Sequence, residues 1–238
     1  GMLVPMAGLR TYPIQVAEKG ICWLRMRAHG QPGHGSTPHD DNAVVHLGRA
    51  LARLRDGRRM PIHVTPTTAG LIRTLAARLP LARGLALRSL LSPRLAPWVL
   101  QRLPAEQASI FRALLSNTVA PTVLQAGVKT NVIPSVAEAE LDCRLLPGQT
   151  PKDVMQEVSA LAGPAVELEP LKLGVGVEFD SNTDLFRLLG QTLLAHDPQA
   201  IPVPFMMTGA TDAAQYARLG ITVYGFTPGQ LGADLPLT

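Results

Sequence analysis

The chain has 238 residues, of which 46% are hydrophobic and 17% are charged. This composition supplies enough apolar material for one large domain or two small domains, and it argues against a disordered chain. The formal charge of +4 comes from basic residues spread along the sequence, and aromatic residues make up only 4%. Nucleic-acid binding favours a clustered basic surface with aromatic residues for base stacking, so we expect no nucleic-acid partner.

The cysteines and the most apolar stretch exclude further classes of protein. Cys22 and Cys143 follow no C-x-x-C spacing, which argues against a disulfide scaffold or a thiolate zinc site, and we expect both to be small buried hydrophobic residues. Residues 71–100 are interrupted by arginines and prolines and predict no membrane span. Since the first residues lack a signal-peptide pattern, we expect a cytoplasmic protein with no membrane partner.

The first predicted elements are a strand, a glycine-rich loop and a helix. Residues 21–28 alternate apolar and polar side chains, the period of two that is typical of a half-buried strand. Glycines at positions 30, 33 and 35 end this strand, and residues 37–40 offer caps for the following helix. The apolar stripe of that helix is Val44, Leu47, Leu51 and Leu54.

A helical insertion separates this helix from the next strands. Residues 58–116 are rich in leucine, alanine and arginine with several prolines, which predicts short amphipathic helices. Strands are predicted at 117–128 and 137–145. A helix then begins after the cap Thr150, with proline at its first position, and ends at Gly163, before a strand at 166–171.

The order of these elements indicates the fold class. Strand, helix, strand, strand, helix, strand is the ferredoxin-like βαββαβ topology, an α+β arrangement with two helices on one face of an antiparallel sheet and the other face open. Beyond it the sequence predicts a helix at 184–195, a loop at 206–212, a short helix ending at Leu219 and a strand at 221–226. This second part is typical of the end of an α/β sheet.

Four segments in order resemble signature elements of the M20 metallopeptidase family. Residues 30–38, GQPGHGSTP, resemble the G-x-P-G-H-[AG]-S-x-P signature that opens the lid domain of these enzymes. Residues 130–134 (TNVIP), 141–144 (LDCR) and 208–213 (TGATDA) resemble the N-x-I-P, D-x-R and G-x-T-D-A elements. The likeness covers nearly the whole chain, and the insertion resembles the carboxypeptidase S and N-acyl amino acid hydrolase branch.

The resemblance implies a zinc-dependent aminoacylase, carboxypeptidase or dipeptidase. Such an enzyme hydrolyses an amide next to a free carboxylate, in a peptide or an N-acyl amino acid, with two zinc ions activating water. It implies that residues 1–18 end an N-terminal catalytic segment or hinge and that 173–238 belong to a C-terminal catalytic segment. Residues 19–172, with the insertion at about 58–116, would form a lid that pairs with its twin, so a homodimer is expected.

The resemblance also assigns roles to individual residues. His34 would be the catalytic lid residue that reaches the partner subunit's active site and stabilises the oxyanion formed when zinc-bound hydroxide attacks the amide. Asn131 would contact the substrate, and Arg144 would hold its carboxylate by a bidentate ion pair. Gly209 and Thr211 would bind a carboxylate at a helix N-terminus.

Each assignment has a structural alternative. Asn131 is also suited to a turn, Arg144 to an ion pair on its own strand face, and Thr211 to a helix cap. We interpret His39 and His46 as capping-turn and surface residues. At the level of the whole chain, the rival is a non-catalytic ferredoxin-like module for dimerisation or ligand sensing.

The chain departs from the family in its metal ligands. We identify no counterpart of the family's H-x-D, Glu-Glu or H-G-x-x-E motifs, and we expect them before residue 1 and after Thr238. The histidines also lack H-E-x-x-H spacing. We therefore predict that the chain holds no metal and is inactive alone, and that flanking sequence without these motifs would favour the sensing module.

Overall fold

The computed structural model of the protein describes residues 3–54, 60–227 and 229 and has a mixed α/β fold. The chain packs as two units. The first unit holds the described residues of 1–19, 63–115 and 176–238, and the second holds those of 20–62 and 116–175. The predicted start of the insertion near residue 58 lies outside the described residues, as do residues 230–238.

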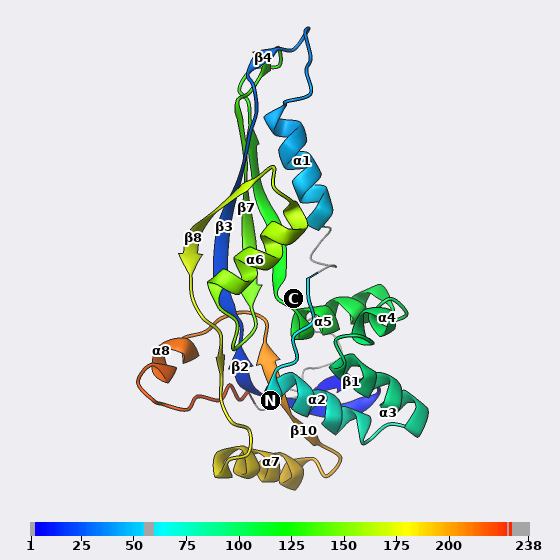
Figure 1. The fold of residues 1–238 in the computed structure, drawn as a ribbon. Helices are drawn as coiled ribbons and strands as arrows, with labels where there is room; N and C mark the ends of the chain where they lie inside the picture. Colours follow the sequence, from blue (N-terminus) through cyan, green and yellow to red (C-terminus); the bar gives the residue numbers. More distant parts are fainter. Residues whose placement is uncertain (1–2, 55–59, 228, 230–238) are drawn as a thin grey trace. The chain divides into compact units, whose positions relative to one another are not determined.

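The second unit is a four-stranded antiparallel sheet with helices on one face (Figure 1). The sheet has the order β5-β7-β3-β8, and its strands are β3 (Gly20–His29), β5 (Thr118–Ala126), β7 (Val136–Leu145) and β8 (Glu167–Leu173). Helices α1 (Ala43–Leu54) and α6 (Pro151–Ala162) pack against it and against each other. The strands predicted at 21–28 and 137–145 and the helix after Thr150 are confirmed.

The register of β3 against β7 separates a buried face from a charged face. In both strands every second residue is buried, including Leu24 and Met26 on β3 and Leu141 on β7. These side chains form one core with the inner faces of α1 and α6. The intervening residues, such as Arg25 and Glu140, lie on the opposite face, so a shift of one residue would bury charges.

Cys22 and Cys143 lie opposite each other in this core, both fully buried and free, which confirms their prediction as small hydrophobic residues. The Gly30 N–H donates to the Ser135 carbonyl, and these two residues continue the register of β3 and β7. Hydrogen-bonded pairs recur at every second residue, so the even-numbered residues of β3, including Cys22, form hydrogen-bonded pairs with β7. Side chains are farther apart at such pairs than a disulfide requires. Burial also raises the pKa of Cys22 to about 11, which keeps the thiol protonated.

A capping box fixes the start of α6. The Thr150 hydroxyl oxygen accepts the Asp153 N–H, the Asp153 carboxylate accepts the Thr150 N–H, and proline occupies the first turn. The helix ends at Gly163, whose φ of 87° favours glycine. These local signals explain why the sequence predicts both ends of this helix.

The first unit is built on a second sheet, with β10 parallel to β2 and β1 and β9 antiparallel to it. Its strands are β1 (Val4–Met6), β2 (Leu9–Glu18), β9 (Val177–Glu178) and β10 (Ile201–Met207). Helices α7 (Asp184–His196) and α8 (Ala213–Ala217) belong to this unit. Tyr12, Ile14 and Val16 of β2 form its core with Leu193 of α7.

The predicted short helices of the insertion are confirmed. They are α2 (Pro66–Ala76), α3 (Leu81–Arg88), a 3-10 turn (Ser89–Leu91), α4 (Ala96–Leu100) and α5 (Ala105–Leu115). The packing groups these helices with the first unit, in which α2 contacts β10 and β2. Among the described residues, no helix combines the length and the apolar character needed to cross a bilayer.

The structure differs from the sequence prediction around β2 and β10, neither of which was expected. Both contain prolines, which are disfavoured inside strands. β10 lies at the edge of its sheet and pairs only with β2. Pro202 and Pro204 are two residues apart, so both backbone nitrogens are on the side away from β2, where no hydrogen bond is needed. Pro13 of β2 lies between the residues that pair with β1 and β9, so no donor is needed there.

The strand predicted at 221–226 is wrong. This segment forms a single antiparallel bridge, between Gly225 and Gln15 of β2. β1 pairs with residues 9–11 of β2 and β9 pairs with Ala17 and Glu18, so the bridge at Gln15 lies in the short gap between them. A side chain at position 225 would collide with Gln15, which explains glycine at this contact.

Asn117 joins three elements of the second unit and is fully buried. Its Oδ1 accepts the Leu146 N–H at 2.9 Å after β7, and its Nδ2 donates to the Glu157 carboxylate of α6 at 2.9 Å. The residue itself directly precedes β5. One amide therefore links both strands to the helix.

We predict that Asn117→Ala lowers the free energy of unfolding by about 2 kcal/mol, because the buried Leu146 N–H loses its acceptor. Chemical denaturation of the chain measures this. Gln125→Ala, on the exposed part of β5, is the matched control and should change stability by less than about 0.5 kcal/mol. Equal losses in the two variants would contradict the role given to Asn117.

Candidate functional site

Two of the predicted site residues meet on a short ribbon at one end of the second unit. β4 (Gly33–His34) pairs antiparallel with β6 (Val132–Ile133), so that His34 lies opposite Val132. The Gly35 N–H donates to the Asn131 carbonyl at 2.9 Å and extends the pairing by one residue. Figure 1 shows β4 beyond the N-terminal end of α1. The ribbon therefore brings His34 and Asn131 together, and both are exposed.

Hydrogen bonds to Ser36 determine which nitrogen of neutral His34 carries the proton. The Ser36 backbone N–H donates to His34 Nδ1 at 3.2 Å, and the Ser36 hydroxyl lies 2.7 Å from the same nitrogen. A backbone N–H is always a donor, so Nδ1 accepts and the proton of a neutral imidazole is on Nε2. His34 thus presents an Nε2–H donor on an exposed loop.

The turn behind His34 is closed by further bonds to its backbone. The carbonyl of His34 accepts the Thr37 N–H at 3.0 Å and the Thr37 hydroxyl at 3.2 Å. At the base of the loop the Gln31 N–H donates to the Asp41 carbonyl at 2.9 Å. A side chain at Gly30 would lie 2.5 Å from the Ala43 nitrogen, so only glycine fits there. These contacts hold the histidine at a defined place.

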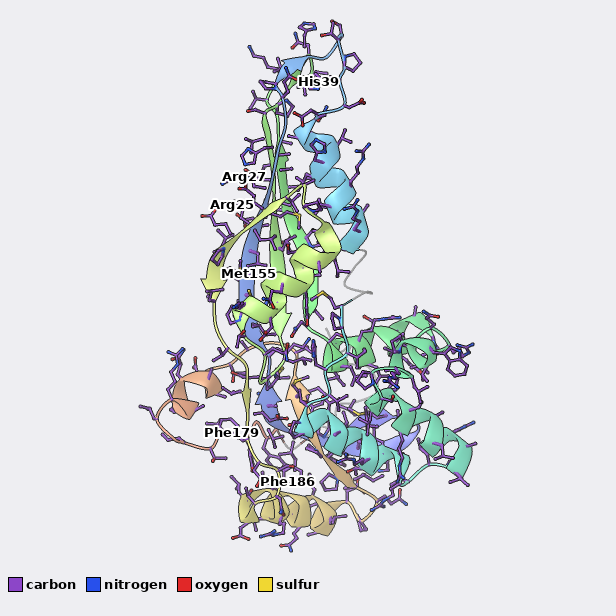
Figure 2. All side chains as sticks on the ribbon, in the orientation of Figure 1. Arg25, Arg27, His39, Met155, Phe179 and Phe186 are labelled. Carbon is purple, nitrogen blue, oxygen red and sulfur yellow. The ribbon has the colours of Figure 1, made fainter. Side chains whose placement is uncertain are left out.

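His39 packs beneath the ribbon and is neither the helix cap nor the surface residue that we expected. Its Nε2 lies 2.9 Å from where a Cβ of Gly33 would be, and Ile133 lines the same space. Both of its ring nitrogens are buried with no hydrogen-bond partner among the described residues. Figure 2 labels His39 in this loop. The imidazole therefore packs against Gly33, and a larger residue at position 33 would require His39 to shift.

The cap of α1 is Asn42, not one of the residues 37–40. The Asn42 Oδ1 accepts the Val44 N–H at 2.9 Å. The Nε2 of His46, in the first turn, lies 3.0 Å from the Asp41 carboxylate, within hydrogen-bond distance, so His46 is a partnered surface residue. The predicted cap fails because the loop continues past the proline to close on Gly30.

Arg144 lies far from the ribbon within this unit and already has a carboxylate partner. Its Nε and Nη2 donate to both oxygens of Asp142 at 2.7 and 2.9 Å, a bidentate pair on one strand. β7 begins at Val136 near the ribbon, so Arg144 is displaced along the strand by roughly 26 Å, at 3.3 Å per residue. The second unit alone does not bring Arg144 together with His34.

Gly209 and Thr211 lie in the first unit, between β10 and α8. Thr211 donates to Glu18 of β2 twice, from its N–H at 2.8 Å and from its hydroxyl at 2.5 Å. The Ala214 N–H donates to the other oxygen of Glu18 at 3.3 Å. The structure therefore places an internal carboxylate where the resemblance would place that of the substrate.

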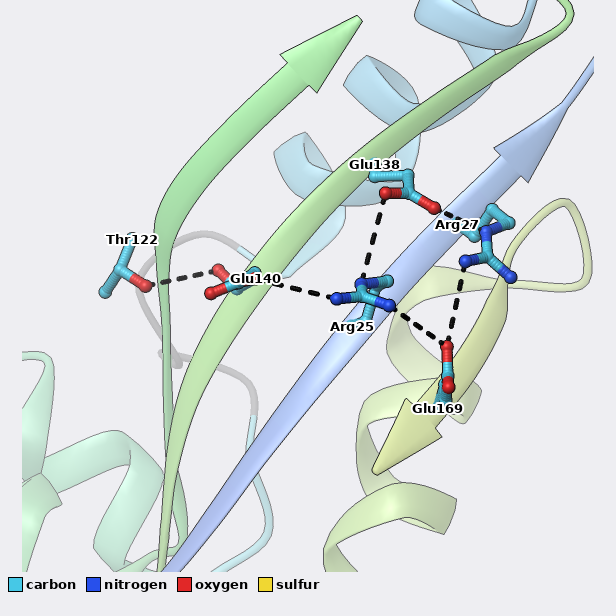
Figure 3. Close-up of polar contacts among 6 residues, drawn as sticks. All are labelled: Arg25, Arg27, Thr122, Glu138, Glu140 and Glu169. Atoms are coloured by element: carbon cyan, nitrogen blue, oxygen red, sulfur yellow. Dashed lines mark hydrogen bonds and ion pairs between the residues drawn. The ribbon is translucent and has the colours of Figure 1, made fainter. Parts of the chain in front are cut away.

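The open face of the sheet carries paired charged residues, at the polar positions of the predicted alternation (Figure 3). Arg25 lies 3.5 to 4.0 Å from three carboxylates, those of Glu138, Glu140 and Glu169. Arg27 contacts Glu138 at 2.5 Å, which raises the pKa of Arg27, and Glu169 at 3.7 Å. The strand alternation could have indicated these pairs, but not their partners on β8.

The described part of the chain contains no cluster of side chains suited to binding a metal ion. No group of three or more histidine, cysteine, aspartate or glutamate residues is placed to hold a metal ion there. A zinc centre needs three or four such ligands around one point. The described residues therefore do not fit a zinc site.

Curated proteins similar to this chain are hydrolases of acylated amino acids or related enzymes. The chain is 29% identical to mouse and 30% identical to bovine N-fatty-acyl-amino acid synthase/hydrolase PM20D1, over 90% of this chain and 43% of each relative. It is 26% identical to the probable carboxypeptidase S-like 2 of Dictyostelium discoideum, over 90% of this chain and 41% of that protein. The chain thus spans less than half the length of these relatives.

Solved structures share the fold. The M20 family metallo-carboxypeptidase Sso-CP2 from Sulfolobus solfataricus matches with a TM-score of 0.56 at 18% identity, covering 88% of this chain and 57% of that one. Human carnosine dipeptidase 1 matches with a TM-score of 0.53 at 12% identity, covering 89% of this chain and 48% of that one. At these identities the likeness concerns the fold alone.

The sequence profile of the M20 peptidase dimerisation domain matches residues 16–167, which contain the His34 loop, the Asn131 turn and Arg144. This match covers more than half of the chain. The chain therefore belongs to the M20 peptidase family.

Proposed function

We propose that this chain is the dimerising and substrate-recognising part of a zinc-dependent amidohydrolase. The complete enzyme cleaves an amide next to a free carboxylate, in a peptide or an N-acyl amino acid. Membership of the M20 peptidase family and the likeness to hydrolases of N-fatty-acyl-amino acids and to a carboxypeptidase S-like protein support this proposal. The described residues do not fit a metal centre, and the proposal assigns the zinc ligands to other parts of the complete enzyme.

One observation carries the proposal: the ribbon presents His34 as a hydrogen-bond donor. Its Nδ1 accepts from Ser36, so in the neutral imidazole the Nε2–H is the group left to donate. When an amide carbonyl is attacked, its oxygen gains negative charge, and a fixed N–H donor stabilises that charge more than it stabilises the substrate. The backbone carbonyl of Asn131 accepts the N–H of Gly35, the neighbour of His34, which supports the proposal that Asn131 contacts the substrate.

A homodimer through the second unit would present this donor to a neighbouring active site. The order β5-β7-β3-β8 with α1 and α6 supports the ferredoxin-like topology proposed for the lid. β5 is an edge strand with Val123 and Leu124 exposed, and α1, which contacts β5, exposes Val44 and Val45. An unpaired strand edge beside apolar side chains suits pairing with an identical copy.

The rival function, a non-catalytic dimerisation or sensing module, has support of its own. Two predicted substrate ligands, Arg144 and Thr211, are hydrogen-bonded to internal carboxylates. In a module that only dimerises, these residues would stay hydrogen-bonded to the internal carboxylates. The two functions differ in whether His34 and Arg144 affect turnover in the complete enzyme.

We predict that His34→Ala in the complete enzyme lowers kcat by roughly a hundredfold with little change in KM, because the donor acts on charge that develops in the transition state. Mixing this variant with a second one that lacks its general base tests action in trans. Heterodimers should recover one working site from the intact metal centre of the first subunit and the histidine of the second. His46→Ala is the matched control with near-normal activity, and no recovery after confirmed subunit exchange would contradict action across the dimer.

We predict that Arg144→Ala raises KM for carboxylate-bearing substrates with kcat nearly unchanged, because an ion pair present in both ground and transition states contributes uniform binding. Asp142→Asn should lower KM, since it weakens the carboxylate that competes for the same guanidinium. Steady-state kinetics of both variants measure these opposite shifts. Unchanged KM values in both variants would mean that Arg144 only pairs with Asp142 on its own strand and does not bind the substrate.

A further inference from the structure

Glu18 is a buried carboxylate with an unusual set of partners. It is the last residue of β2 and is only 1% exposed. Its Oε2 accepts the N–H and the hydroxyl of Thr211, and its Oε1 accepts the Ala214 N–H. Thr211 and Ala214 lie 193 and 196 residues further along the chain. Glu18 thus contacts both sides of the turn that leads into α8.

These bonds give Glu18 the role that a capping side chain has in other helices. Asp212, at the cap position of α8, makes no side-chain capping bond. The Thr211 hydroxyl oxygen accepts the Ala213 N–H at 3.1 Å while its proton is donated to Glu18. A buried carboxylate is costly without such donors, and bonds to a charged acceptor are about twice as strong as neutral ones. The turn and the carboxylate therefore stabilise each other.

Glu18 lies next to the point where the chain passes from the first unit to the second. The first unit ends its opening segment at Lys19, and the second begins at Gly20 with β3. The backbone that carries Glu18 is thus the backbone that passes from one unit to the other.

We propose that Glu18 is a positioning residue that holds the Thr211 turn of the G-x-T-D-A element. Thr211 then acts through the conformation of this turn, because its N–H and hydroxyl are already bound to Glu18. The substrate contact expected of this loop is then assigned to the segment before Thr211, which includes Gly209. The inference deepens the proposed function, and it rests on that function only in its kinetic test.

Amide hydrogen exchange in the 238-residue chain tests the contact without any activity. In Glu18→Gln one acceptor oxygen is replaced by an amide NH₂, which cannot accept. We expect the Thr211 and Ala214 amides to exchange about tenfold to a hundredfold faster, the factor that corresponds to losing a hydrogen bond to a charged group. Amides of β10 should keep their protection.

Glu178→Gln is the matched control in the same unit. The Glu178 carboxylate accepts the Thr67 N–H at 2.6 Å at the start of α2. This variant should speed exchange at Thr67 and leave Thr211 unchanged, whereas Glu18→Gln should do the reverse. Equal protection of Thr211 in both variants would overturn the proposal.

A second variant covers the outcome in which Glu18→Gln does not fold. Thr211→Val keeps the backbone N–H and the size of the side chain but removes the hydroxyl donor. It should speed exchange at Ala214, because the carboxylate is held less firmly, and Thr211→Ser should restore protection. An Ala214 amide that is insensitive to Thr211→Val would also overturn the proposal.

Kinetics of the complete enzyme separate a positioning role from a substrate contact. If Thr211 acts through the turn that Glu18 holds, the double variant Glu18→Gln/Thr211→Val should be no worse than the more severe single variant. Additive losses would mean that Thr211 binds the substrate directly. An enzyme without amidase activity would refute the proposed function and leave the exchange results for Glu18 intact.

Discussion

The pairing of β3 with β7 is the constraint on which the second unit depends. Ten residues of each strand pair without interruption, so the register is fixed along the whole length. The even-numbered residues of β3, including Cys22 and Leu24, form the core that α1 and α6 cover. The odd-numbered residues Arg25 and Arg27 lie among carboxylates on the opposite face. They belong to the pairs without backbone hydrogen bonds, in which side chains approach most closely. Beyond His29 the same two segments continue into the ribbon that carries His34.

Internal carboxylates are a recurring feature of the predicted substrate ligands. Asp142 binds Arg144 by two hydrogen bonds, and Glu18 binds Thr211 by two. Such pairs keep cationic and N–H groups satisfied and hold them in one geometry. His34 differs, because its Ser36 contacts use only Nδ1 and leave the Nε2–H for a ligand. This contrast is why we assign the chemistry to His34 and a positioning role to Glu18.

Local patterns predicted the elements whose causes are local. The alternation in 137–145 predicted β7, and the Thr150 and Asp153 pair predicted the start of α6. β2 and β10 contain prolines and were not predicted, because only the sheet shows that Pro13 lies in the gap between β1 and β9 and that β10 is an edge strand. The roles of Glu18, His39 and Asn117 depend on contacts between distant segments, and no spacing in the sequence carries that information. His34 and Asn131 were found through a family motif, and the ribbon explains their proximity.

The protonation of His34 is the most direct test of the account, because the proposed donor exists only in one tautomer. A long-range ¹H–¹⁵N correlation spectrum of the imidazoles, recorded where His34 is neutral, identifies the protonated nitrogen. The account predicts a proton on Nε2 and a hydrogen-bonded, unprotonated Nδ1, held by the Ser36 N–H. A neutral His34 with its proton on Nδ1 would contradict the ribbon geometry and remove the donor on which the proposed function rests.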